Sequence, residues 1–105
     1  FLDGNIKRQT MKESESLGNK AALSSYKSAI ARYIRSAMVL NDIKYDDLVV
    51  ALADRGVVLT ASNLRNKVSK GLFSADTLVM LIEILKVEEV ALIDILKQVH
   101  NDSSR

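Results

Sequence analysis

The fold of this chain is decided by the sequence TASNLRNKVSKG at residues 60–71. The hydroxyl of Thr60 or of Ser62 can accept a hydrogen bond from the unpaired backbone N–H groups of a first helical turn. Gly71 suits the position after a last turn, where the chain commonly turns left-handed and glycine does so without strain. The stretch therefore predicts a short helix, over about residues 60–70, with both ends marked.

One side of this expected helix is apolar and the other sides are polar. Ala61, Leu64 and Val68 stand three and four residues apart and form a narrow apolar stripe. The other positions carry side chains that can reach base edges or phosphates in a DNA groove: Ser62, Asn63, Arg65, Asn66, Lys67 and Lys70. The pattern is typical of a recognition helix, although a plain surface helix also combines an apolar stripe with solvated charge.

Charge is distributed in blocks along the chain, and the formal net charge of +2 conceals them. Residues 55–73 hold four basic residues and no acidic residue, whereas residues 41–54 and 74–105 each have a balance of −3. Clustered positive charge is what phosphate binding requires. Arg55, which begins the acid-free stretch, therefore joins Lys67 and Lys70 as a candidate for phosphate contact.

Four further helices are expected around this one. Apolar residues at helical spacing place them at about residues 24–40, 45–55, 74–85 and 88–99. Proline is absent, which suits helices joined by short turns. We expect an all-α fold: one five-helix domain over residues 23–100, preceded by a flexible polar segment (1–22) and followed by a polar tail (101–105). A core is expected from Leu52, Leu64, Phe73, Leu78 and Leu81.

The last expected helix is apolar over more than one face. One stripe should face the core: Ala91, Leu92, Ile95, Leu96 and Val99. Val90, Ile93 and the aliphatic stem of Lys97 then remain on its flank, where a monomer would leave them in water. A twofold axis through that flank would bury the same patch on two subunits, which predicts a homodimer. The alternative is that residues 1–22 fold back and cover the flank.

The sequence lacks the ingredients of an enzyme. His100 is the only histidine and cysteine is absent, so a histidine-pair metal site or a Ser/His/Asp arrangement cannot form within one chain. The four glycines are isolated and form no phosphate loop. We expect no cofactor, no metal and no small-molecule substrate. No apolar run approaches the roughly 18 residues that a membrane span needs, and no signal-peptide pattern is present, which favours a cytoplasmic location.

The five helices and their turns resemble the lambda-repressor-like helix-turn-helix domains of phage and bacterial regulators, over about residues 26–96. The resemblance rests on the inward and turn positions of that family, which are matched by Leu48, Leu52, Gly56, Leu64, Gly71, Leu78, Leu81, Leu85 and Val87. The turn departs from the pattern, since Gly56 to Leu64 spans eight residues where the family has about six. The run LRNKVSKGLF at residues 64–73 more closely resembles a bacterial domain family of uncharacterised function, itself thought to be helix-turn-helix-like.

This resemblance implies sequence-specific binding of double-stranded DNA by a bacterial or phage transcriptional regulator. Residues 60–70 would lie in the major groove, with Ser62, Asn63, Arg65 and Asn66 toward base edges. Two alternatives stay open: a protein-interaction or adaptor module that keeps the fold and assembles through its C-terminal helix, and an antitoxin or phage-encoded regulator that does both. DNA binding should weaken steeply with salt, whereas an apolar interface should not.

Overall fold

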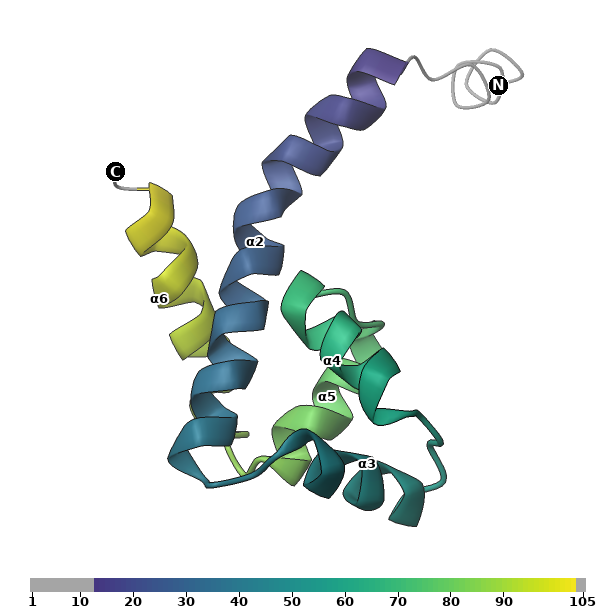
Figure 1. Cartoon of the computed structure of the whole chain (residues 1–105). Coiled ribbons are helices and arrows are strands. Elements are labelled where there is room, and N and C mark those ends of the chain that lie inside the picture. Colours follow the sequence, from purple (N-terminus) through teal and green to yellow (C-terminus); the bar gives the residue numbers. More distant parts are fainter. Residues whose placement is uncertain (1–12, 104–105) are drawn as a thin grey trace, which may run out of the picture.

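The computed structural model describes residues 13–103, and within them the chain forms helices joined by short turns, with no strand (Figure 1). The helices are α2 (Glu13–Leu40), α3 (Tyr45–Asp54), α4 (Ala61–Lys70), α5 (Ala75–Ile84) and α6 (Ala91–Ser103). The all-α, five-helix architecture expected from the sequence is confirmed. None of these helices is both long enough and apolar enough to cross a membrane.

The long helix α2 organises the others. It packs against α6 on one side and α4 on another, while α3 contacts both α4 and α5. Figure 1 shows α6 running antiparallel to α2, and the first half of α2 projecting beyond the rest of the molecule. The polar helix α4 is thus held between α2 and α3, and one of its sides is left toward solvent.

Two helices differ in length from the expectation. Helix α2 begins at Glu13 rather than near residue 24, so residues 13–22 are helical, and residues 1–12 of the expected flexible segment lie outside the described residues. The sequence ESESLGNKAAL has no proline, and lengthening an existing helix requires no new nucleation. At the other end, α6 continues through Ser103 into the expected polar tail.

The ends of α4 are those that the sequence predicted. The Thr60 hydroxyl accepts from the backbone N–H of Asn63 at 3.0 Å, so Thr60 rather than Ser62 is the N-cap. Gly71 adopts φ 62°, and the N–H groups of Gly71 and Leu72 donate to the carbonyls of Val68 and Lys67. This pair of bonds is the Schellman motif that ends many helices, and it fixes the length of α4.

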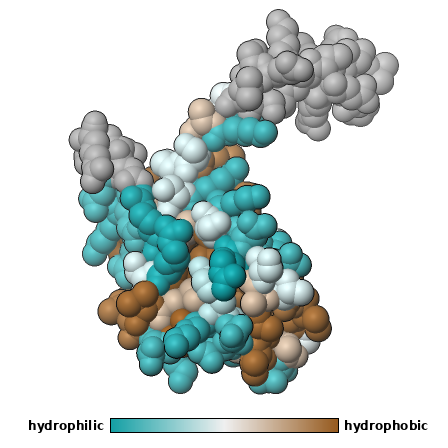
Figure 2. All heavy atoms as spheres, in the orientation of Figure 1, coloured by the Kyte–Doolittle hydropathy of each residue, from teal (hydrophilic) through white to brown (hydrophobic). Residues whose placement is uncertain are grey.

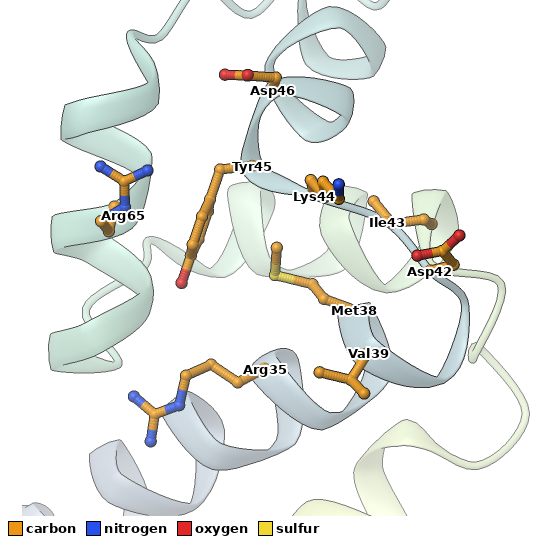
Figure 3. A pocket seen from close by; sticks show the side chains of 9 residues that line it. All are labelled: Arg35, Met38, Val39, Asp42, Ile43, Lys44, Tyr45, Asp46 and Arg65. Carbon is orange, nitrogen blue, oxygen red and sulfur yellow. The ribbon is translucent and has the colours of Figure 1, made fainter.

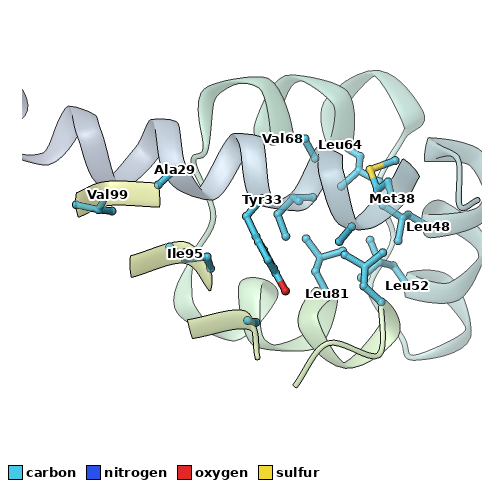
Figure 4. Packing of buried hydrophobic residues seen from close by; sticks show 14 residues of the cluster. Ala29, Tyr33, Met38, Leu48, Leu52, Leu64, Val68, Leu81, Ile95 and Val99 are labelled. Atoms are coloured by element: carbon cyan, nitrogen blue, oxygen red, sulfur yellow. The ribbon is translucent and has the colours of Figure 1, made fainter. Parts of the chain in front are cut away.

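The core lies where α2, α3, α4 and α5 meet, and it continues between α2 and α6 (Figure 4). Ile34, Leu48, Leu52, Leu64 and Leu81 are fully buried. Phe73 and Leu78 are partly buried and pack against the edge of this cluster, so they are mostly covered, as expected, but lie at its rim.

Helix α6 is more exposed than its sequence suggested. Its buried side consists of Ala91, Ile95 and Val99, which are four residues apart and rest mainly on α2. Leu92 and Leu96 were expected to face the core but are 68% and 39% exposed. One supporting helix needs only a narrow stripe, which explains why the wider stripe is not buried.

Candidate nucleic-acid interface

The solvent side of α4 carries most of the residues singled out from the sequence. Leu64 and Val68 point inward and are fully buried, which turns the opposite side of the helix outward. Ser62, Asn63, Asn66 and Lys70 are exposed there, and Lys67 is half-buried on the flank. The side chains of α4 itself include no acid. A polar surface is thus displayed on a helix that is anchored on its other side and capped at both ends.

Four of these residues line one hollow of about 480 Å³. They are Asn63, Asn66, Lys67 and Lys70, with Leu59 and Leu72 from the turns before and after α4 completing the wall. We call this surface the lysine hollow. It contains asparagine amide groups, which can donate and accept hydrogen bonds, and lysine ammonium groups, which only donate them. None of its lining residues is acidic, so the field within it is positive.

Arg65 faces a different surface. Its guanidinium carbon lies 5.1 Å from the centre of the Tyr45 ring, which is a cation–π contact between α4 and the first residue of α3. Both residues line a second, open hollow of about 600 Å³ between α2, α3 and α4 (Figure 3). We call it the arginine groove, and it is lined by Arg35, Met38, Val39, Asp42, Ile43, Lys44, Tyr45, Asp46 and Arg65.

Arg55 has a partner within the chain. Its guanidinium forms an ion pair with the carboxylate of Glu83 in α5, with both side chains largely exposed. An exposed pair of this kind contributes little to stability and can exchange partners. Arg55 therefore remains a weaker candidate for phosphate contact than Lys67 and Lys70, whose surroundings are free of acid.

The acids at the start of α3 lie on the arginine side of α4. Asp46 lines the arginine groove, and the Asp47 carboxylate accepts the backbone N–H of Lys44 at 2.9 Å. Asp47 thereby satisfies one of the unpaired donors at the helix start. A phosphate close to Asp46 would meet repulsion from its carboxylate, whereas no acidic residue lines the lysine hollow. The two sides of α4 therefore differ in the ligands that they favour.

Sequence reasoning missed the contribution of Arg35 and Tyr45. Arg35 lies in α2, thirty positions before Arg65, yet both line the arginine groove. The sequence showed only that Arg35 stands off the apolar face of its helix. Which residues it would meet depends on how α2 crosses α4, and no local pattern contains that information.

The proposed dimer residues also lie on the surface. Val90 is 46% and Ile93 is 58% exposed, and Lys97 is exposed beside them. The outward position of Leu92 and Leu96 enlarges this patch beyond what the sequence indicated. The outer side of α6 is therefore more apolar than expected.

Fold and site together define an all-α protein that displays an acid-free polar helix on a packed helical frame. The chain belongs to the family described as Domain of unknown function (DUF6471), whose model matches residues 26–90. The match covers more than half of the chain and includes the run at residues 64–73, so the expected kinship with a family of uncharacterised function is confirmed. No curated protein and no solved structure matches the chain.

Proposed function

We propose that this protein binds double-stranded DNA through the solvent side of α4. The observation that carries the proposal is the lysine hollow, in which Asn63, Asn66, Lys67 and Lys70 come together without an acid. Asparagine can pair in a bidentate way with adenine in the major groove, and lysine contacts phosphates or guanine. The α3–turn–α4 arrangement would present this side chain set to the groove, as in helix-turn-helix regulators.

The support beneath α4 strengthens the proposal. Base reading requires side chains to be held in register, and a helix does so only if its own ends and inner side are fixed. Thr60 caps the start of α4, Gly71 ends it, and Leu64 and Val68 anchor it in the core. Ser62 is exposed in the first turn, where it can reach a base edge or a phosphate.

A binding assay with matched variants tests this function. Fluorescence anisotropy would follow the full chain on duplexes selected from a random pool, at several salt concentrations. Lys67→Ala and Lys70→Ala should weaken binding to all duplexes alike and reduce the slope of log affinity against log salt by about 0.9 for each lost contact. Lys86→Ala removes the same charge from a residue that does not line the lysine hollow, and it should leave the slope unchanged. Parent-like binding by a folded variant with all four hollow residues changed to alanine would refute the assignment.

Two further variants separate base reading from backbone contact. Asn63→Ala and Asn66→Ala should reduce the preference for the selected sequence by about 1–3 kcal/mol per lost base contact, while non-specific binding persists. Such selectivity would fit a transcriptional regulator of a bacterium or phage, acting in the cytoplasm. If neither asparagine affects selectivity, α4 contributes affinity but does not read the sequence.

We also propose a homodimer through the outer side of α6. The supporting observation is the exposed apolar set Val90, Leu92, Ile93 and Leu96, which has no partner in the described part of the chain. A twofold axis buries the same patch on both subunits and would hold two α4 helices for half-sites about one helical turn apart. The same surface would serve a protein-interaction module if the chain did not bind DNA.

Sedimentation of the parent and of Ile93→Asp decides the assembly. The charged side chain should convert a dimer into a folded monomer, with weaker binding to a two-site duplex and unchanged binding to a single half-site. A parent that is monomeric at high micromolar concentration excludes the dimer. Because burial of apolar surface is insensitive to salt, the dimer should persist in salt concentrations that abolish DNA binding.

A further inference from the structure

The arginine groove combines features that the proposed DNA contact does not use. Its floor is apolar: Met38 is buried, and Ile43 and Tyr45 are half-buried. Val39 forms one wall and is 79% exposed. Figure 2 shows apolar surface at the lower left of the molecule. A duplex backbone has no need of an apolar floor, so the groove calls for a different ligand.

Two arginines lie at one end of the groove. Arg35 from α2 and Arg65 from α4 stand on either side of this end, and the Tyr45 hydroxyl points toward the space between them (Figure 3). The Tyr45 ring also supports the Arg65 guanidinium at 5.1 Å. Guanidinium groups bind carboxylates through two parallel hydrogen bonds, and a stacked guanidinium is already oriented for this contact.

Three basic and two acidic residues line the groove, so its formal net charge is +1. Asp46 lies on the backbone side of Tyr45, opposite the hydroxyl, and Asp42 and Lys44 lie at the other end of the groove (Figure 3). Asp42 and Lys44 are of opposite sign and together add no net charge there. A ligand along the groove would therefore place its negative group at one end and its apolar body along the middle.

We propose that the arginine groove binds a small amphipathic carboxylate, an aromatic or branched aliphatic acid. Its carboxylate would lie between Arg35 and Arg65, and its apolar body would cover Met38 and Val39. The groove volume of about 600 Å³ falls within the range of small-molecule sites, which are mostly apolar with a few placed polar groups. Carboxylate binding itself does not depend on the proposed DNA function.

The position of Arg65 gives the ligand a regulatory consequence that does rest on the proposed function. Arg65 belongs to α4, so a bound carboxylate would add negative charge beside the helix that is proposed to meet DNA. Duplex DNA and the acid would then disfavour each other's binding, and by linkage each would weaken the other by the same factor. The acid is expected to act as an effector that releases the protein from DNA.

Phenylacetate is a suitable probe, followed by two-dimensional amide NMR of the full chain. Saturable shifts are expected for residues 35–46 and for Arg65, with no comparable response to phenylacetamide, which lacks the charge, or to acetate, which lacks the ring. Arg35→Gln and Arg65→Gln should each weaken binding about tenfold or more, as loss of a charge-assisted contact implies. Lys20→Gln removes one positive charge from an exposed site on α2 and serves as the control.

Three results would overturn carboxylate binding in the groove. Equal shifts with acetate or inorganic phosphate would show a general anion site, and equal shifts with phenylacetamide would show an apolar surface without charge selection. Absence of saturable shifts at tens of millimolar phenylacetate is the third. If phenylacetate binds but no duplex does, carboxylate binding in the groove is supported and the proposed DNA function is refuted. If a duplex binds but phenylacetate does not, the DNA function is supported and carboxylate binding is refuted.

Discussion

Gly71 lies directly against the backbone of Lys27, at the point where the end of α4 meets α2. A β carbon placed on Gly71 would lie 2.0 Å from the Lys27 carbonyl oxygen and 2.7 Å from its carbonyl carbon. No side chain fits such a gap, and Gly71 also holds a left-handed φ of 62°. The residue that ends α4 is therefore also the residue that permits α2 and α4 to approach each other.

Gly71→Ala should lower the free energy of unfolding severely. The left-handed conformation costs about 1–2 kcal/mol for a residue with a β carbon, and forcing an atom against packed backbone adds about 1–3 kcal/mol. Urea unfolding followed by circular dichroism measures the loss. Gly56→Ala is the matched control, because Gly56 has φ 91° but a β carbon added there would meet no atom within 4 Å. Equal losses at the two glycines would show that the contact with Lys27 is unimportant.

Helices α2, α3, α4 and α5 each end in a Schellman motif with a left-handed residue, and in two of them that residue is not glycine. Asp42, Gly56, Gly71 and Lys86 have φ between 53° and 91°, and each ending pairs the two Schellman hydrogen bonds. After α5, the N–H of Lys86 donates to the carbonyl of Glu83 and that of Val87 to the carbonyl of Ile82. The backbone thus turns left-handed at Lys86 even though its side chain opposes this.

Lys86→Gly should stabilise the protein by about 0.5–1 kcal/mol, because relief of the left-handed strain exceeds the extra chain entropy of glycine. Thermal and urea unfolding measure the gain. Lys86→Ala removes the same charge but keeps the β carbon, and it should change stability little. A gain of the same size with alanine would trace the effect to charge rather than to backbone conformation.

Local signals explain which parts of the fold the sequence predicted. The ends of α4 at Thr60 and Gly71 are set by hydrogen bonds that span three to five positions. A short stretch of sequence was therefore enough to predict them. Leu64 and Val68 were recognised as inward-facing for the same reason. The prediction that Leu92 and Leu96 face the core was wrong, because the width of the buried stripe on α6 depends on how many helices cover it.

The same difference between local and long-range structure separates the two hollows beside α4. Asn63, Asn66, Lys67 and Lys70 lie within one helix, and helical spacing alone brings them to one side. The arginine groove depends on the crossing of α2 and α4, which places Arg35 and Arg65 in the walls of one hollow. Such an arrangement of residues thirty positions apart follows from tertiary packing, and a single sequence carries no local sign of it.

Thr60→Ala should destabilise the protein by about 1 kcal/mol, since the backbone N–H of Asn63 loses its acceptor at 3.0 Å. Thr60→Ser keeps the hydroxyl and should retain most of the stability. Hydrogen exchange of the Asn63 amide provides a local readout, and it should quicken in the alanine variant. If serine and alanine lose the same amount, the methyl group of Thr60 matters and the cap does not.

Tyr33 is expected to make the stability of the folded chain decline at alkaline pH. Its side chain extends from α2 between Ile95 and Leu81 and is 6% exposed (Figure 4). Burial, and after it the negative charge of Asp94, raise the pKa of the Tyr33 phenol above its usual value near 10. The folded state thus favours the neutral phenol more than the unfolded state does.

Stability from Tyr33 should be fully present below pH 10 and should be lost as the pH rises through the raised pKa of the folded state, because the unfolded chain releases the proton first. Urea unfolding at intervals from about pH 8 to above pH 11 would measure the decline. Tyr33→Phe should remove this part of the pH dependence, whereas Tyr26→Phe, at a tyrosine that is 46% exposed, should retain it. Asp94→Asn should reduce the loss of stability at alkaline pH without abolishing it, because burial is the larger cause of the raised Tyr33 pKa. An unchanged decline in Tyr33→Phe would show that Tyr33 is not its source.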